Sequence, residues 1–122
     1  MRIVTSVQPT SVYGGNFTGD VRLSMLSAAA EADRPDVAMV SFDQGAVTCW
    51  HEHPGGQLIW VVSGLAVVGT DEHSEVLQPG SLVEAPAGER HWHGAAAGED
   101  AVLLCFTWGT TSWTDAVPER SI

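Results

Sequence analysis

Residues 45 to 64 read GAVTCWHEHPGGQLIWVVSG, and this stretch says most about the fold of the chain. Side chains of a β-strand alternate between its two faces, so residues two positions apart point the same way. On a strand, His51 and His53 therefore share a face, and Cys49 shares it with them. Two imidazoles at this spacing can bind one metal ion.

A second stretch of the same kind occupies residues 80 to 96 and reads GSLVEAPAGERHWHGAA. The same alternation places His91 and His93 on one face and Trp92 on the other. A single pair of this kind would favour an ordinary core or surface role. Two pairs, in a chain with only five histidines, favour a metal site built from two strands.

The rest of the sequence predicts many short strands. Alternating and β-branched runs predict strands at Val21–Ser27, Val37–Phe42, Val47–His53, Gln57–Ser63, Leu65–Thr70, Ser74–Leu77, Ser81–Ala85 and Ala101–Trp108. Turn residues separate them at short intervals, which is typical of an antiparallel sandwich or barrel. The one helix-prone stretch is Ala28–Ala32, which Pro35 soon ends. The polar tail Trp113–Ile122 is expected to be loose or covered by a partner.

The composition limits the function classes. The chain has 122 residues, which fits a single domain. It carries 15 acidic residues, five arginines and no lysine, for a net charge of −10. A basic patch for nucleic acid or anionic membranes is therefore not expected. Without lysine, the chain cannot form a Schiff base with a substrate or with pyridoxal phosphate.

The location and the redox state follow from weaker signals. No apolar run reaches the ~18 residues of a spanning helix, and the first twelve residues do not resemble a signal peptide. A cytoplasmic protein is expected. A disulfide between Cys49 and Cys105 is possible, but nothing in the sequence requires it.

The first stretch resembles the first motif of the cupin family, G-x5-H-x-H-x3/4-E-x6-G. Gly45, His51, His53 and Gly64 match it, and Gln57 stands where the family usually has glutamate. A glutamine oxygen can bind a metal, but it brings no charge. Gln57 as a hydrogen-bonding core residue is the alternative, and its motif position favours ligation.

The second stretch resembles the second cupin motif, G-x5-P-x-G-x2-H-x3-N. Gly80, Pro86, Gly88 and His91 match it, and Ala95 replaces the asparagine. The resemblance implies an all-β fold, a small jelly-roll barrel (double-stranded β-helix). The barrel core would span about residues 35–108, after N-terminal strands in 1–34 and before a tail at 109–122. It also implies one divalent metal, held by the side chains of His51, His53, Gln57 and His91.

A narrower likeness rests on four strings: residues 16–19 (NFTG), 50–54 (WHEHP), 56–57 (GQ) and 91–96 (HWHGAA). They are similar to a subgroup of small bacterial cupins that includes the cupin-type hydroxynitrile lyases. That likeness implies manganese on three histidines and one glutamine, with iron, zinc or nickel as alternatives. It also implies that His93 is a general base beside the metal.

The predicted function is that of a metal-dependent enzyme acting on a small organic molecule. The metal would act as a Lewis acid and His93 would move a proton, in a lyase of the cyanohydrin or C–C type, or in a related cyclase or isomerase. A metal-dependent dioxygenase and a non-catalytic cupin that binds a small ligand are the alternatives. A homodimer is expected because exposed strand edges invite pairing, with residues 2–7 as the exchanged or added strand.

Several other residues carry weaker expectations. Strand residues near the expected metal are predicted to shape a pocket: Val40, Phe42 and Thr48. Trp60 and Trp108 could line a cavity. Cys49 could contribute a further ligand, although a small buried thiol is the commoner role.

Overall fold

The computed structural model describes residues 1–5, 7–11 and 16–120. Within these residues the secondary structure consists of β-strands alone, and no helix long and apolar enough to cross a membrane is present. The strands are β1 (Thr10–Ser11), β2 (Phe17–Thr18), β3 (Val21–Ser27), β4 (Asp36–Phe42), β5 (Val47–Thr48), β6 (His51–Glu52), β7 (Gln57–Gly64), β8 (Ala66–Gly69), β9 (Ser74–Leu77), β10 (Leu82–Ala85), β11 (Trp92–Ala95), β12 (Ala101–Thr107) and β13 (Ser112–Trp113).

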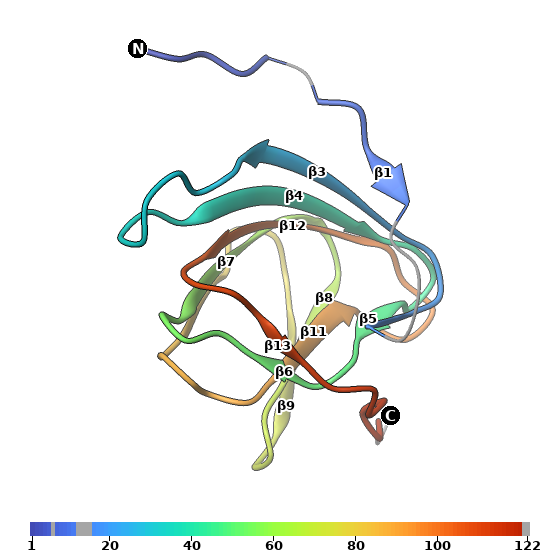
Figure 1. The fold of residues 1–122 in the computed structure, drawn as a ribbon. Coiled ribbons are helices and arrows are strands. Elements are labelled where there is room, and N and C mark those ends of the chain that lie inside the picture. Colours follow the sequence, from blue (N-terminus) through green and yellow to red (C-terminus); the bar gives the residue numbers. More distant parts are fainter. Residues whose placement is uncertain (6, 12–15, 121–122) are drawn as a thin grey trace.

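Two antiparallel sheets face each other and enclose the core (Figure 1). The larger sheet has the strand order β1-β3-β4-β12-β7-β10, and the smaller one has the order β2-β5-β11-β8-β9. The short strands β6 and β13 pair with each other in a separate two-stranded sheet. This is the all-β arrangement that the sequence predicted.

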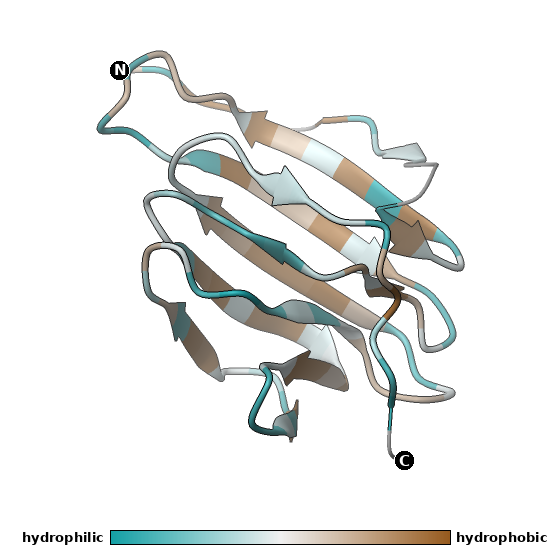
Figure 2. Cartoon of the chain, turned by 60° about the horizontal axis from the view of Figure 1, so that its bottom comes forward, coloured by the Kyte–Doolittle hydropathy of each residue, from teal (hydrophilic) through white to brown (hydrophobic). Residues whose placement is uncertain are grey.

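Alternation along the strands builds the core. In β4 the side chains of Ala38, Val40 and Phe42 are buried, and the residues between them are only partly buried. β12 repeats this pattern, and its buried residues include Leu103 and Cys105. In Figure 2 the hydrophobic colour gathers on the strands and the hydrophilic colour on the turns. One face of the large sheet thus closes the barrel interior.

Most predicted strands agree with the structure to within one residue, and two of them, β3 and β9, agree at both ends. The prediction of one strand at Val47–His53 is wrong, because this stretch forms two strands, β5 and β6. The cause is a change of hydrogen-bonding partner at Trp50: the Cys49 N–H still donates to the Asn16 carbonyl, next to β2, whereas the Trp50 N–H donates to the Ala116 carbonyl. The ladder of the small sheet therefore stops after β5.

Two further expectations are wrong. Ala28–Ala32 forms no helix: it belongs to the loop of the β3–β4 hairpin, whose strands pair directly with each other. The tail is not loose up to Arg120. The Arg120 guanidinium donates to the carbonyls of Gly45, at 2.7 Å, and Ala95, at 3.0 Å, so it ties the tail to the barrel.

The N-terminal segment leaves the barrel. Residues 1–5 are exposed and lie in no strand, and Figure 1 shows them projecting away on the outer side of β3. After them, the Val7 carbonyl accepts a hydrogen bond from the Ser24 hydroxyl of β3 at 3.2 Å.

Candidate metal centre

The two histidine motifs meet through the backbone. His51 and His91 form an isolated antiparallel bridge, in which the N–H of each donates to the carbonyl of the other, at 3.0 and 2.9 Å. In each motif the second histidine follows two residues later and points to the same side as the first. This pairing carries both HxH pairs to one end of the barrel interior.

Four imidazole rings cluster there. The ring centre of His51 lies 4.9 Å from that of His53, 4.5 Å from that of His91 and 5.1 Å from that of His93. His51, His91 and His93 each offer one nitrogen, and these atoms lie within 4.8 Å of one another. All four rings are buried. His51, His91, His93 and Gln57 are arranged as a possible metal site, with His53 beside them.

Hydrogen bonds fix which nitrogens face the centre. The Nδ1 of His51 lies 2.8 Å from the Cys49 carbonyl oxygen, and the Nδ1 of His91 lies 3.1 Å from the Glu89 carbonyl oxygen. A carbonyl can only accept, so Nδ1 carries the hydrogen in both rings. In the neutral rings Nε2 then keeps its lone pair, and Nε2 is the atom that binds a metal.

The rings are held in the neutral form. Burial lowers the pKa of His51 to about 3, against the opposing hydrogen bond to the Cys49 carbonyl. Burial and the neighbouring His91 lower the pKa of His53 to about 4. Burial also lowers the pKa of His91, and it lowers the pKa of His93 well below its usual value. Neutral imidazoles are the form that metals require.

The donor atoms fit a cation. Among the described residues, the buried side-chain nitrogens and oxygens without a hydrogen-bond partner are the Nε2 of His51, the Nε2 of His53 and the Nδ1 of His93. The Nε2 of His91 faces the Oε1 of Gln57 at 3.0 Å, which sets two lone pairs against each other. Two ligand atoms bound about 2.1 Å from one ion and at a right angle would also be about 3.0 Å apart. One cation would satisfy all these atoms.

Thr107 orients the amide of Gln57. The Gln57 Nε2 donates to the Thr107 hydroxyl at 2.9 Å, so Oε1 is the amide atom that faces His91. Thr111 does the same for His53, whose Nδ1 lies 2.9 Å from the Thr111 hydroxyl oxygen. Partners of this kind align ligands and raise metal affinity.

Replacing Thr107 with valine is expected to weaken Mn²⁺ binding by about 10- to 100-fold, because the amide loses the partner that fixes its orientation. Affinity would be measured by competition with a chelator of known affinity. Thr107→Ser keeps the hydroxyl and should bind as the wild type does. Equal affinity in Thr107→Val and the wild type would exclude this role for Thr107.

A chamber of about 140 Å³ opens beside the histidines. Its walls include aromatic and aliphatic side chains such as Phe17, Leu23 and Trp113. Among the described residues that line it there is one carboxylate, Asp36, and no arginine. Such a chamber is small by the standard of ligand pockets, which measure about 300–1,000 Å³.

The pocket residues predicted on neighbouring strands are confirmed, since the chamber wall includes Val40, Phe42 and Thr48. The Thr48 hydroxyl also accepts the backbone N–H of His93 at 3.1 Å. Cys105 is buried and reaches the chamber wall. Burial raises its pKa to about 12, so its thiol stays protonated and is a poor ligand.

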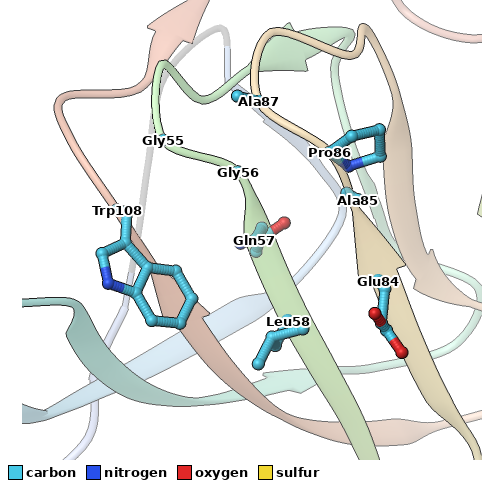
Figure 3. A pocket seen from close by; sticks show the side chains of 9 residues that line it. All are labelled: Gly55, Gly56, Gln57, Leu58, Glu84, Ala85, Pro86, Ala87 and Trp108. Carbon is cyan, nitrogen blue, oxygen red and sulfur yellow. The ribbon is translucent and has the colours of Figure 1, made fainter.

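The predictions for Trp60 and for Cys49 need correction. Trp60 is exposed and does not line the chamber. Trp108 does line a cavity, but this is a groove of about 430 Å³ beside Leu58 and Glu84 and not the chamber (Figure 3). Cys49 is buried but does not lie in the chamber wall, because the break after β5 ends the strict alternation that would have turned it there. Cys49 and Cys105 do not form a disulfide.

The sequence reasoning missed Asp36, Thr107, Thr111 and Trp113. Thr107 could have been found, because it lies two positions after Cys105 on one strand and shares its face. Thr111 and Trp113 lie in or beside a segment expected to be loose. The ring centre of Trp113 lies 4.4 Å from that of His51. The two residues are directly opposite each other in the β6–β13 ladder.

Known proteins resemble this chain in sequence and in fold. Over 81 residues the chain is 41% identical to an (R)-mandelonitrile lyase of Granulicella tundricola; the match covers 66% of this chain and 62%, less than two thirds, of that protein. A cupin-like protein of Thermotoga maritima is 31% identical, with a TM-score of 0.85 over 97% of this chain and 92% of its own. An acetylacetone dioxygenase of Acinetobacter johnsonii shares the fold at 13% identity, with a TM-score of 0.78 over 93% of this chain and 78% of its own. The cupin domain profile matches residues 38–107, and the chain belongs to the cupin family.

Proposed function

We propose that this cupin is a metal-dependent lyase that cleaves a carbon–carbon bond in a small, uncharged cyanohydrin and releases a carbonyl compound and hydrogen cyanide. The observation that carries the proposal is the set of unpartnered imidazole nitrogens beside the chamber. The 41% identity to an (R)-mandelonitrile lyase supplies the reaction type.

His51, His53, Gln57 and His91 are the proposed metal ligands. All four are neutral, so a divalent ion bound to them would keep its full charge. Manganese is the proposed metal, and it would act as a Lewis acid that polarises the substrate oxygen. The protein's contribution is to hold the four donors in a buried site.

The chamber favours a small, neutral, largely apolar substrate. Its volume of about 140 Å³ excludes nucleotides and sugars larger than one ring. Apart from the metal, the described wall residues include no cationic side chain and one carboxylate, Asp36, so the wall offers no partner for a second anionic group, such as the far carboxylate of a dicarboxylate. The aromatic rings of Phe17 and Trp113, 5.2 Å apart, offer a surface for an aryl or alkyl group.

His93 is the proposed proton carrier. Its Nδ1 has no hydrogen-bond partner, and burial lowers the pKa of its imidazole, which is therefore neutral before the reaction. It would take the proton of the substrate hydroxyl. The electron pair of the C–C bond would leave with the cyanide carbon while the carbonyl forms. The lowered pKa of His93 would then favour return of the proton to cyanide, which yields hydrogen cyanide.

The test is the rate of benzaldehyde release from mandelonitrile by the manganese-loaded protein, corrected for spontaneous decomposition in buffer. His93→Ala should keep its metal and lose about 10²- to 10⁴-fold in rate. His73→Ala is the matched control, because His73 is an exposed histidine and its replacement should leave the metal content and the rate unchanged. Release no faster than in buffer would reject the lyase, and oxygen uptake by an iron-loaded sample would favour a dioxygenase instead.

A further inference from the structure

The proposed metal ligands lie between two cavities. His51, His53 and Gln57 line the chamber, whereas His91 lines a second, smaller cleft of about 60 Å³. His91 is only 5% exposed, and its Nε2 faces the Gln57 oxygen, which has no hydrogen to offer it. The histidine cluster can therefore be approached from the chamber and, separately, through this cleft.

The cleft lies at an open edge between the two sheets. β9 is the last strand of the small sheet and β10 is the last strand of the large one. Val68 of the small sheet and Ile59 and Val83 of the large sheet form part of its inner walls. Its volume equals the share of about two molecules in liquid water. The cleft is too narrow for an organic substrate and wide enough for a metal ion with little of its water.

Two carboxylates belong to the cleft. Residues directly opposite each other in a ladder point to the same face of the sheet. His93 lies opposite Val68, and Val68 lies opposite Glu75, so the exposed Glu75 points to the same inner face as the buried His93. Glu89 also lines the cleft, and its backbone carbonyl accepts the Nδ1 hydrogen of His91 at 3.1 Å.

The charge of these carboxylates is not cancelled. Among the described residues, neither Glu75 nor Glu89 forms an ion pair. Arg90, which is next to Glu89 in sequence, pairs with Asp71 at 3.2 Å and lies over the ring of Trp50, outside the cleft. A narrow opening with charge of one sign concentrates ions of the other sign. Carboxylate oxygens are also ligands that suit Mn²⁺.

The chamber is the less favourable entrance for an ion. Its walls include Phe17, Leu23 and Trp113, which offer no replacement for the water that an entering ion must lose. Its one carboxylate among the described residues, Asp36, accepts the backbone N–H of Ala29 at 2.7 Å. The cleft, by contrast, leads from two unpaired carboxylates to a proposed ligand.

We propose that the cleft between β9 and β10 is the route by which a divalent metal ion enters and leaves the histidine cluster. Glu75 and Glu89 are its first, transient ligands, and His91 receives the ion from them. The His91 ring is held by one hydrogen bond, to the Glu89 carbonyl, so a rotation that admits the ion breaks a single bond. The inference rests on the proposed metal centre but not on the lyase reaction.

The test is the rate of Mn²⁺ uptake by the full chain after a chelator has removed its metal. Samples mixed with Mn²⁺ are stopped at set times with excess chelator, desalted and analysed for manganese. Glu75→Gln and Glu89→Gln should each slow uptake about threefold, and the double variant about tenfold. Glu72→Gln and Glu84→Gln are the matched controls, because they remove the same charge at exposed sites that do not line the cleft.

A second pair of variants changes the width of the cleft. Val83 is partly buried in its wall. Val83→Ala should speed uptake and Val83→Phe should slow it, with circular dichroism to confirm that both are folded. Each variant should change metal release by the same factor, because a route serves entry and exit alike. The final metal content should stay at about one ion per chain.

Each result decides the proposal. Wild-type uptake in the double glutamine variant, or equal slowing by Glu72→Gln, would overturn the cleft as the route. Faster uptake in Trp113→Ala, with no change in either Val83 variant, would also overturn it, because the ion would then enter through the chamber. A wild type that takes up no manganese would overturn the metal centre and the route together. Uptake as predicted in a protein without lyase activity would confirm the route and reject the lyase alone.

Discussion

Replacing His51 with alanine is expected to remove nearly all bound metal, from about one ion per chain to less than about a tenth. His51 is the central ring of the cluster, because its centre lies within 5.1 Å of those of the other three buried histidines. Its Nε2 has no partner in the protein. Elemental analysis after loading and desalting measures the change, and His73→Ala is the control.

Alanine variants of His53 and His93 show which of these two histidines is a metal ligand and which is the base. The family resemblance predicts His53 as a ligand and His93 as the base, whereas His93 is the residue whose nitrogen lies within 4.8 Å of those of His51 and His91. If the prediction holds, His53→Ala loses metal and His93→Ala keeps it but loses activity. The opposite pattern would exchange their roles. Full metal content in His51→Ala would contradict a site at this place.

Replacing Gly64 with alanine is expected to lower the free energy of unfolding by about 3 kcal/mol or more, through two effects that add. Gly64 has a φ of +78°, a conformation that alanine adopts only with strain. Its Cβ would also collide with the backbone of Asp100, where the turn after β7 meets the start of β12. Urea unfolding followed by circular dichroism measures the loss.

Gly88→Ala separates the two effects. Gly88 has nearly the same φ, +75°, but a Cβ there would meet nothing within 4 Å. It should therefore lose only about 1 kcal/mol, the strain of the backbone alone. Equal losses at Gly64 and Gly88 would show that the contact with Asp100 yields easily and that the turn is not tightly packed.

The fold was predictable where local pattern decides the structure. Alternation located β3 and β9 at both ends, because each pairs with neighbouring strands along its length. The two HxH motifs predicted a meeting of the two histidine pairs, and the bridge between His51 and His91 confirms that meeting. The motif glycines marked turns that require positive φ, at Gly45 and Gly64.

The remaining features depend on distant parts of the chain. The break between β5 and β6 arises because Trp50 takes its backbone partner from Ala116, which no local pattern reveals. The same contact explains why the tail is docked although its composition is polar. Trp113 and Thr111 reach the site only because the tail returns there, so the sequence offered no signal for them. The outward faces of Trp60 and Trp108 follow from a register that composition does not determine.

The most direct test is the metal content of the wild-type chain, expressed without a tag and analysed for all transition metals as purified and again after incubation with Mn²⁺ and desalting. The buried, neutral and unpartnered imidazoles predict about one ion per chain after loading. A chain that retains no metal under either condition, while remaining folded, would contradict the proposed centre and the lyase chemistry that depends on it.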